Sequence, residues 1–301
     1  MSYYQVTTTH ACSKLPMGFY RPPQEYKYLN YNDRPEGVNI NTIVVHYTVL
    51  DYPLSYKILS HADGERPIAS VHYMINADGR IDNLVDDYYR AWHAGVSEWK
   101  SVKGVNDYSI GIELVNPGSG EQGCFAVADE IKNSPDECVR NSFPVDQISA
   151  LKELIKCLKE EHPTITDIIG HSDIAPGRKI DPGVMFPWED LARDGIGIYA
   201  NLASTDNAKI LYGFGDSSES VLELKHALSR LGYSYLDNSP EFDKSLANVV
   251  RAFHFHYNQN IDNEIANGIG WGDWTNLDEV LLGELIGKYN TLNDVHSIDE
   301  L

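Results

Sequence analysis

The sequence predicts an α/β fold, with a central mixed sheet flanked by helices and a small three-helix C-terminal domain. Two observations carry this prediction. Short apolar runs of strand character alternate with helically spaced segments over residues 42–161, as in folds built from one sheet and covering helices. From about residue 208 the pattern changes to three short amphipathic helices in succession. At 301 residues, the chain can form one large domain or two ordinary ones.

Four strands are expected in the first part of the chain. Ile43, Val44 and Val45 form a continuous β-branched run, which is typical of a strand buried on both faces. The turn-forming sequence NADG, residues 76–79, separates the second expected strand from the third. The expected strands span residues 42–47, 70–76, 80–85 and 109–115.

Two helices are expected among these strands, at about 53–60 and at 145–161. The longer one has a single apolar face, formed by Ile148, Leu151, Leu154, Ile155 and Leu158. In the C-terminal part, the run Ser220–Tyr233 begins with Ser220 and Glu223, the spacing of a capping box, and Gly232 is expected to end its helix. Two further helical runs lie within 242–258 and 277–289.

His254 and His256 alternate with aromatic residues in the second C-terminal helix. They could form a metal site, or they could pack within the bundle with some histidine exposed. Two residues separated by one position do not share a helix face, so packing is the favoured interpretation.

Composition and charge exclude several classes of function. A formal net charge of −20 argues against a nucleic-acid partner, because phosphates need a basic surface. No apolar run approaches the length of a membrane span, so no transmembrane segment is expected. The N-terminal residues also lack the basic and then apolar pattern of a secretion signal.

The four cysteines show no metal-binding CxxC spacing. Cys124 and Cys138 flank a polar segment and could close a disulfide loop worth about 3 kcal/mol, or they could be unrelated thiols. Cys157 is expected to be half-buried in a helix. Cys12 lacks the upstream apolar stretch of a lipoprotein signal, so lipidation is not predicted.

The segment Gly170–Trp188, GHSDIAPGRKIDPGVMFPW, contains the strongest chemical pattern in the chain. His171 and Asp181 are separated by a segment rich in proline and glycine, which can fold back and bring both side chains to one point. Imidazole and carboxylate groups are common zinc ligands. His46, near the end of the first expected strand, is the best candidate for a third ligand, although a lone strand histidine is more often a core residue.

Glu113 lies between Ile112 and Leu114 in the fourth expected strand, where an unpaired carboxylate is costly. Beside a metal-activated water, such a carboxylate is the usual general base of hydrolysis. Three plainer interpretations stay open at this point. Glu113 could lie on the rim of an edge strand, the HSD of residues 171–173 could cap a helix, and Lys179 could be a solvated surface charge.

The chain resembles zinc N-acetylmuramoyl-L-alanine amidases of the amidase-2 type, the family that includes peptidoglycan recognition proteins. The resemblance covers about residues 35–190. Five motifs occur in the family's order: IVVHYT at 43–48, VHYMINADGRI at 71–81, AWHAG at 91–95, SIGIELVNPG at 109–118 and GHSDIAPGRKIDPG at 170–183.

This resemblance implies an active hydrolase that uses Zn²⁺ to cleave the amide bond between N-acetylmuramic acid and L-alanine in peptidoglycan or muropeptides. It implies that His46, His171 and Asp181 hold the zinc, that Glu113 is the general base and that Lys179 stabilises the oxyanion. It also implies that His93 lines the substrate site. Two other functions stay open: a non-catalytic peptidoglycan recognition protein, and a zinc hydrolase acting on a substrate other than the wall.

Residues 208–290 resemble a three-helix peptidoglycan-binding domain through LKHALSRLGY and VVRAFHFHY. A wall-binding domain favours the periplasm or cell envelope, with cytoplasmic muropeptide recycling as the alternative. The glycine-containing segment before it also predicts a domain that is separable from the catalytic one. The expected organisation is an N-terminal arm at 1–35, a zinc amidase domain at 36–190, a linker at 191–207, the helical domain at 208–290 and a tail at 291–301.

Overall fold

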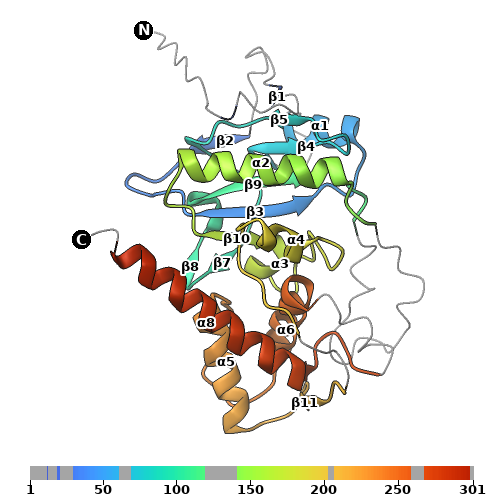
Figure 1. Cartoon of the computed structure of the whole chain (residues 1–301), viewed down its shortest axis with the longest axis vertical. Helices are drawn as coiled ribbons and strands as arrows, with labels where there is room; N and C mark the ends of the chain where they lie inside the picture. Colours follow the sequence, from blue (N-terminus) through green and yellow to red (C-terminus); the bar gives the residue numbers. More distant parts are fainter. Residues whose placement is uncertain are drawn as a thin grey trace.

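A six-stranded mixed sheet forms the centre of the molecule in the computed structural model (Figure 1). The structure describes residues 12, 19–20, 30–60, 69–118, 141–202, 207–258 and 268–298, with side chains up to residue 290 in the last range. The strands lie in the order β1-β5-β4-β9-β3-β10. All neighbouring pairs are parallel except β4 and β5, which the NADG turn joins as an antiparallel hairpin. The predicted α/β class with a mixed sheet is therefore confirmed.

The sheet strands are β1 (Phe19–Tyr20), β3 (Thr42–Tyr47), β4 (Tyr73–Ile75), β5 (Ile81–Asn83), β9 (Ser109–Leu114) and β10 (Asp167–Gly170). Three small two-stranded sheets pair β2 (Tyr31–Asp33) with β6 (Tyr89–Ala91), β7 (Glu98–Trp99) with β8 (Val102–Lys103), and β11 (Ile210–Tyr212) with β12 (Trp274–Thr275). The helices are α1 (Tyr52–Ser60), η2 (Val105–Asp107), α2 (Val145–Glu161), α3 (His171–Ile174), α4 (Trp188–Arg193), α5 (Glu219–Leu231), α6 (Lys244–Tyr257) and α8 (Asn276–Ile298).

The four expected strands correspond to β3, β4, β5 and β9, and the two expected helices correspond to α1 and α2. One strand differs in extent from the prediction, and one strand was not predicted. β4 begins only at Tyr73; just before it, the Gly111 amide of β9 donates to the ring of His72, through Nδ1, at 3.0 Å. The edge strand β10 was not anticipated, since its four residues are too short to show a periodicity.

The C-terminal helices α5, α6 and α8 form a bundle on the side of the sheet where β10 and α3 lie (Figure 1). The predicted cap of α5 is displaced by two residues: Ser218, not Ser220, accepts the amide hydrogen bond from Val221. Asp243 caps α6 in the same way through the Leu246 amide at 2.8 Å. Gly232 follows the last residue of α5, as expected.

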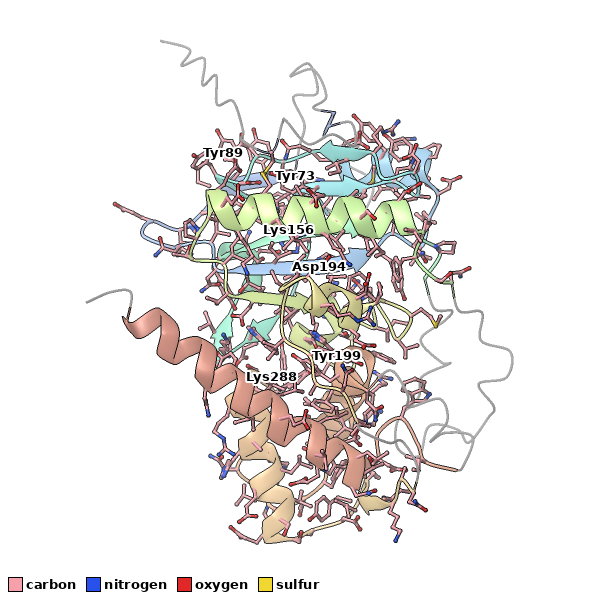
Figure 2. The ribbon with its side chains drawn as sticks, viewed as in Figure 1. Tyr73, Tyr89, Lys156, Asp194, Tyr199 and Lys288 are labelled. Carbon is pink, nitrogen blue, oxygen red and sulfur yellow. A yellow bond between two sulfur atoms is a disulfide. The ribbon has the colours of Figure 1, made fainter. Side chains whose placement is uncertain are left out.

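The bundle packs directly onto the sheet region. One hydrophobic core contains β3 and α2 residues together with residues of α5, α6 and α8. The segment predicted as a linker takes part in this packing, since α4 extends to Arg193 and Ile196, Tyr199 and Ala200 are buried. Lys288 of α8 reaches back to donate to the Tyr199 carbonyl at 2.6 Å (Figure 2). The division into domains remains a prediction, but the two parts share one interior.

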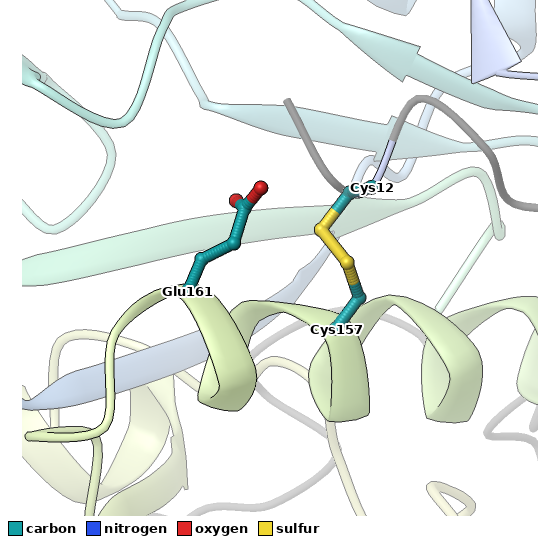
Figure 3. Close-up of side chains that lie close together, drawn as sticks. All are labelled: Cys12, Cys157 and Glu161. Atoms are coloured by element: carbon teal, nitrogen blue, oxygen red, sulfur yellow. A yellow bond between two sulfur atoms is a disulfide. The ribbon is translucent and has the colours of Figure 1, made fainter. Parts of the chain in front are cut away.

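A disulfide joins Cys12 to Cys157 on α2, across 145 residues of sequence (Figure 3). Cys157 is half-buried on its helix, as predicted, but its pairing with Cys12 was not anticipated because connectivity cannot be read from spacing. Cys124 and Cys138 lie outside the described residues. None of the helices in the described ranges combines the length and apolarity needed to cross a bilayer.

His254 and His256 are both buried in α6, so the expectation of exposed histidine is wrong. His254 Nε2 lies 3.1 Å from Asp278 Oδ2, and His256 Nδ1 lies 2.7 Å from Asp173 Oδ2. Their partners lie on different elements, α8 and α3, and neither histidine belongs to a three-donor cluster in the described part of the chain. The packing interpretation therefore fits these contacts, with both rings inside the core.

Candidate active site

The topology brings His46 and His171 to the same edge of the sheet. β10 pairs in parallel with β3, with Gly170 opposite Val45, so the residues that follow each of them are neighbours. His46 is therefore beside His171, the first residue of α3. The chain then returns through the Pro/Gly-rich segment to Asp181, whose carbonyl accepts a hydrogen bond from the Ser172 amide at 2.9 Å. This is the folding back that the sequence predicted.

Three donor atoms converge at this edge. His46 Nδ1 lies 2.9 Å from His171 Nδ1 and 2.9 Å from Asp181 Oδ2, and His171 Nδ1 lies 3.0 Å from the same oxygen. Zinc–ligand distances of about 2.0–2.1 Å in a tetrahedral site place neighbouring donors about 3.3 Å apart. The three side chains thus fit a zinc ion with little movement. Among the described residues, this is the one cluster of three such donors in which every residue is buried.

The second nitrogen of each histidine has its own partner, which leaves both Nδ1 atoms for a metal. His171 Nε2 lies 3.0 Å from the Ala94 carbonyl, to which it must donate. His46 Nε2 lies 3.0 Å from His93 Nδ1. Burial and the neighbouring His171 lower the pKa of His46 to about 4, so its ring is neutral at pH 7. Neutral imidazole is the form that binds metal.

His93 occupies the position behind His46, and its hydrogen bonds have a defined direction. His93 Nε2 lies 3.2 Å from Ser109 Oγ, whose hydroxyl donates to the Val105 carbonyl at 2.6 Å. Ser109 must then accept from His93 Nε2–H, which leaves His93 Nδ1 to accept from His46. The chain of donors therefore specifies the tautomer of His46 in which Nδ1 faces the metal position.

A glycine in β9 makes this arrangement possible. A side chain at Gly111 would meet the ring of His93, since a Cβ there would lie 2.4 Å from His93 Cγ. The ring instead lies across the strand and reaches His46. The loop is held by Asn106, whose Oδ1 accepts from the amides of His93 and Ala94 at 3.1 and 2.8 Å. The predicted role of His93 in lining the substrate site stays a prediction.

Glu113 lies opposite His46 in the β3–β9 register, so both side chains project from the same face of the sheet. Burial, assisted by repulsion from Asp181, raises the pKa of Glu113 to about 8, and the nearby Lys179 opposes that shift. Its Oε2 is buried without a hydrogen-bond partner among the described residues. A carboxylate in this state can exchange a proton with a reacting group near neutral pH.

Lys179 and Asp181 complete the group of charges. Lys179 is half-buried and close enough to Glu113 and His46 to lower the pKa of each. Burial alone would raise the pKa of Asp181, but contact with His171 and His46 holds it well below its usual range. The structure thus brings together the residues predicted for zinc binding and catalysis, with His93 directly behind His46.

Two supporting residues were not identified from the sequence. Asn106 carries no recognisable motif, because its partners are amides made neighbours by a loop. Asp173 belongs to the HSD motif that was considered as a helix cap, and it does accept from the Gly170 amide at 2.8 Å. The two interpretations of HSD are therefore compatible: His171 points to the donor cluster while Asp173 holds the start of α3.

Comparison with known proteins identifies the family. A family model described as N-acetylmuramoyl-L-alanine amidase matches residues 36–184. The amidase AmiD of Escherichia coli is 32% identical over 236 residues, which cover 74% of this chain and 77% of AmiD. An AmiD structure, a complex with the substrate anhydro-N-acetylmuramic acid-L-Ala-D-γ-Glu-L-Lys, matches with a TM-score of 0.64 and 26% identity, covering 86% of this chain and 93% of AmiD.

The structure of AmpDh3 from Pseudomonas aeruginosa matches with a TM-score of 0.63 and 31% identity, covering 86% of this chain and 96% of AmpDh3. Both structural matches extend beyond the catalytic region into the C-terminal part. The relatives are named for catalysis, which favours the enzyme over a non-catalytic recognition protein. The protein is therefore a member of the N-acetylmuramoyl-L-alanine amidase family, and it hydrolyses the amide bond between N-acetylmuramic acid and L-alanine.

Proposed function

We propose that this amidase is a zinc enzyme in which His46, His171 and Asp181 hold the ion. The observation that carries the proposal is the convergence of two imidazole nitrogens and one carboxylate oxygen within 3.0 Å of one another. Three protein ligands leave a fourth position open, as in catalytic zinc sites. A bound zinc ion would polarise the amide carbonyl and lower the pKa of a water molecule at the site to roughly 7.

In this mechanism Glu113 takes the proton of the attacking water and passes it to the leaving amine of L-alanine. Its position opposite His46 places it beside the metal position. Its raised pKa makes it a stronger base than an ordinary carboxylate, so that it can both accept and return a proton near neutral pH. Lys179 stabilises the negative charge that develops on the carbonyl oxygen; its support is a positive charge close enough to Glu113 and His46 to lower the pKa of each.

Elemental analysis and product analysis together test the proposal. Purified protein should contain about one zinc per chain, and digestion of peptidoglycan should release free stem peptides while glycan strands stay intact. Mass spectrometry of the products distinguishes this from glycan cleavage. Disaccharide products, or full activity after removal of all metal with a chelator, would contradict the proposal.

Muropeptides with an anhydro-N-acetylmuramic acid end are the substrates we propose to test first. The AmiD complex contains such a ligand, and an AmpDh3 structure, 29% identical to this chain, contains an anhydromuramic pentapeptide. Parallel assays on intact wall, reduced muropeptides and anhydromuropeptides would rank the three. Equal rates on all three substrates would show that the enzyme does not discriminate the anhydro form of N-acetylmuramic acid from the ordinary form.

We further propose that the protein works in the periplasm or cell envelope rather than in cytoplasmic recycling. The Cys12–Cys157 disulfide supports this location, since structural disulfides persist mainly in oxidising compartments. Thiol alkylation of the protein taken directly from its native cells, followed by mass spectrometry, tests the location. Alkylated Cys157 in most molecules would favour the cytoplasm.

The C-terminal bundle is proposed to bind the wall and to raise the local concentration of the enzyme on insoluble substrate. Ile210 and Leu211 of β11, and Phe214 just after it, are exposed apolar residues, and β11 pairs with β12, which leads into α8 of the bundle; they offer a contact surface. Sedimentation with insoluble peptidoglycan, using Glu113→Gln protein to prevent digestion, should show weaker binding when Phe214→Ser is added. Unchanged binding would remove Phe214 from the proposed surface.

A further inference from the structure

The C-terminal bundle contacts Asp173, which lies two residues after the proposed ligand His171 on the short helix α3. Asp173 is fully buried. Its Oδ1 accepts from the Tyr233 hydroxyl at 2.7 Å, and its Oδ2 lies 2.7 Å from His256 Nδ1. The same Oδ2 accepts from the Gly170 amide at 2.8 Å. Two of the three groups that satisfy this carboxylate therefore come from the bundle.

The helix α3 depends on such outside contacts. It has four residues, and the Ala175 amide closes its single turn on the His171 carbonyl at 3.1 Å. One turn does not stabilise itself, because a helical nucleus orders several residues for one hydrogen bond. The Ala94 carbonyl holds the ring of His171 from one side, but the backbone position of His171 depends on what holds α3, and Asp173 is the buried polar anchor of that helix.

The two bundle residues that bind Asp173 are themselves rigidly placed. The ring of His256 lies between Trp188, at 3.8 Å, and Tyr257, at 3.9 Å between ring centroids, in nearly parallel stacks. Tyr233 follows Gly232, which packs so closely on Trp99 that a Cβ there would lie 2.4 Å from the indole ring. The Gly232 carbonyl also accepts from the Lys100 amide at 2.8 Å.

We propose that Tyr233 and His256 are positioning residues of the metal site, which hold His171 in its metal-binding orientation by fixing Asp173. The bundle is then a structural part of the active site as well as an appended binding region. This inference rests on the proposed zinc function of His171. It gives the bundle a role that is independent of any contact with the wall.

Tyr233→Phe tests the inference with the smallest change, since it removes one hydroxyl and keeps the ring. The matched control is Tyr73→Phe, because Tyr73 is also buried and donates to a buried carboxylate, Asp87, at 2.8 Å. Tyr73 lies in β4, which β9 and β3 separate from β10, the strand that leads into α3. Zinc affinity is measured on the full chain by chelator competition, and the ligand geometry by the visible absorption spectrum of the Co²⁺-loaded protein.

We expect the zinc dissociation constant of Tyr233→Phe to rise about tenfold, at the lower end of the effects of outer-shell partners, with an altered Co²⁺ spectrum. Tyr73→Phe should lower stability to a similar extent and leave both readings unchanged. Equal zinc affinities for the two variants and the wild type would overturn the inference. So would equal weakening in both, because that result would reflect general stability.

A second pair of variants repeats the test on α6. His256→Phe removes the donor to Asp173, whereas His254→Phe removes the donor to Asp278 within the bundle. Zinc binding should weaken only in His256→Phe, and His256→Asn should recover part of it, because an amide can donate from nearly the same place as Nδ1. Loss of binding in both histidine variants, or no recovery by asparagine, would count against the positioning role.

Failure of the proposed function gives a different pattern from failure of this inference. If the wild-type protein bound no zinc, the proposed function itself would be rejected. If the wild-type protein bound zinc and released stem peptides while Tyr233→Phe did the same with unchanged zinc affinity, only the positioning role would be lost.

Discussion

The sheet region and the C-terminal bundle both bury histidines against aspartates, yet among the described residues only the sheet region brings three metal-binding donor atoms to one point with all three residues buried. At the end of β3, His46, His171 and Asp181 direct three acceptor atoms toward one point. In the bundle, the His254–Asp278 contact is a separate pair on α6 and α8. The residue types are the same, and the difference lies in where their lone pairs point.

The far side of the ring has a partner in both regions, since His254 Nδ1 lies 3.1 Å from the Trp271 carbonyl. The difference is the number of donors around the aspartate. At the sheet edge, His171 Nε2 donates to the Ala94 carbonyl and His46 Nε2 donates to His93, which leaves both Nδ1 atoms of the neutral rings as acceptors beside Asp181. In the bundle, Asp278 is satisfied instead, with Thr275 donating to it through both its amide and its hydroxyl at 2.8 Å. A buried histidine beside a carboxylate therefore indicates a metal site only when several acceptor atoms converge and the surrounding N–H and O–H donors are too few to satisfy them.

The largest expected effect comes from removing one histidine of the proposed metal site, and the matched comparison removes one histidine of the bundle. His46→Ala should lose zinc and at least about 10³-fold in kcat/KM, since the metal supplies several kcal/mol to the transition state. His254→Ala should keep zinc and activity per folded molecule while losing about 3 kcal/mol of stability, because Asp278 is left buried without its histidine. Elemental analysis, kinetics and urea unfolding measure these quantities. Full zinc occupancy in His46→Ala would remove His46 from the ligand set.

The next largest effect separates chemistry from metal binding. Glu113→Gln should keep zinc and fold but lose on the order of 100-fold or more in turnover, because the amide cannot accept the proton of water. Glutamine has nearly the same shape, so packing in β9 is retained. Steady-state kinetics on a soluble muropeptide, with zinc content measured in parallel, is the test. Near-normal turnover would assign proton transfer to another group.

A smaller effect tests the tautomer argument. His93→Phe keeps a ring over Gly111 but leaves His46 Nε2–H without its acceptor, so zinc affinity should fall about 10- to 100-fold. Ser109→Ala removes the next link of the chain and should have a weaker effect of the same sign. Chelator competition measures both. A stronger effect from Ser109→Ala than from His93→Phe would contradict the proposed direction of the hydrogen bonds.

The smallest expected effect is on the pH dependence of stability in metal-free protein. The folded pKa of Glu113 is about 8 against an ordinary 4.5, so the folded state retains a proton that the unfolded state loses between these pH values. Its contribution to stability therefore declines as pH rises from 4.5 to 8. The pKa of Asp278 is shifted oppositely: burial raises it, but His254 and Thr275 bring it below its usual value, so its contribution is lost only under acidic conditions.

Glutamine cannot ionise, so Glu113→Gln should remove this decline in the metal-free protein. The difference in unfolding free energy between the variant and the wild type should therefore favour the variant more at pH 8 than at pH 5, by at least about 1 kcal/mol. One pKa unit corresponds to about 1.4 kcal/mol, and relaxation reduces the full value. Urea unfolding at the two pH values, in the presence of a chelator, provides the measurement. A wild-type protein whose stability does not decline over this range would show that Glu113 ionises normally when folded.

Local patterns were sufficient to predict much of this molecule. The β-branched run of β3 and the apolar face of α2 are period-based features, so both elements are predicted at their observed bounds. The site residues were also predictable, because a histidine at a strand end, a carboxylate within a strand and a Pro/Gly-rich loop are each unusual in sequence. The family resemblance then suggested how they combine.

Other features depend on which segments meet in three dimensions. The edge strand β10 is stabilised by its pairing with β3, and the Cys12–Cys157 disulfide joins residues that sequence spacing does not relate.

The amino-acid sequence by itself thus determined the α/β class, the main strands and helices, and which residues make up the candidate site. Only the tertiary structure decided that the bundle shares one hydrophobic core with the sheet region and that His256 packs against Asp173. The physical reason is range: periodicity and turn chemistry act between neighbours in sequence, whereas a buried carboxylate must be satisfied by whichever donors the fold brings to it.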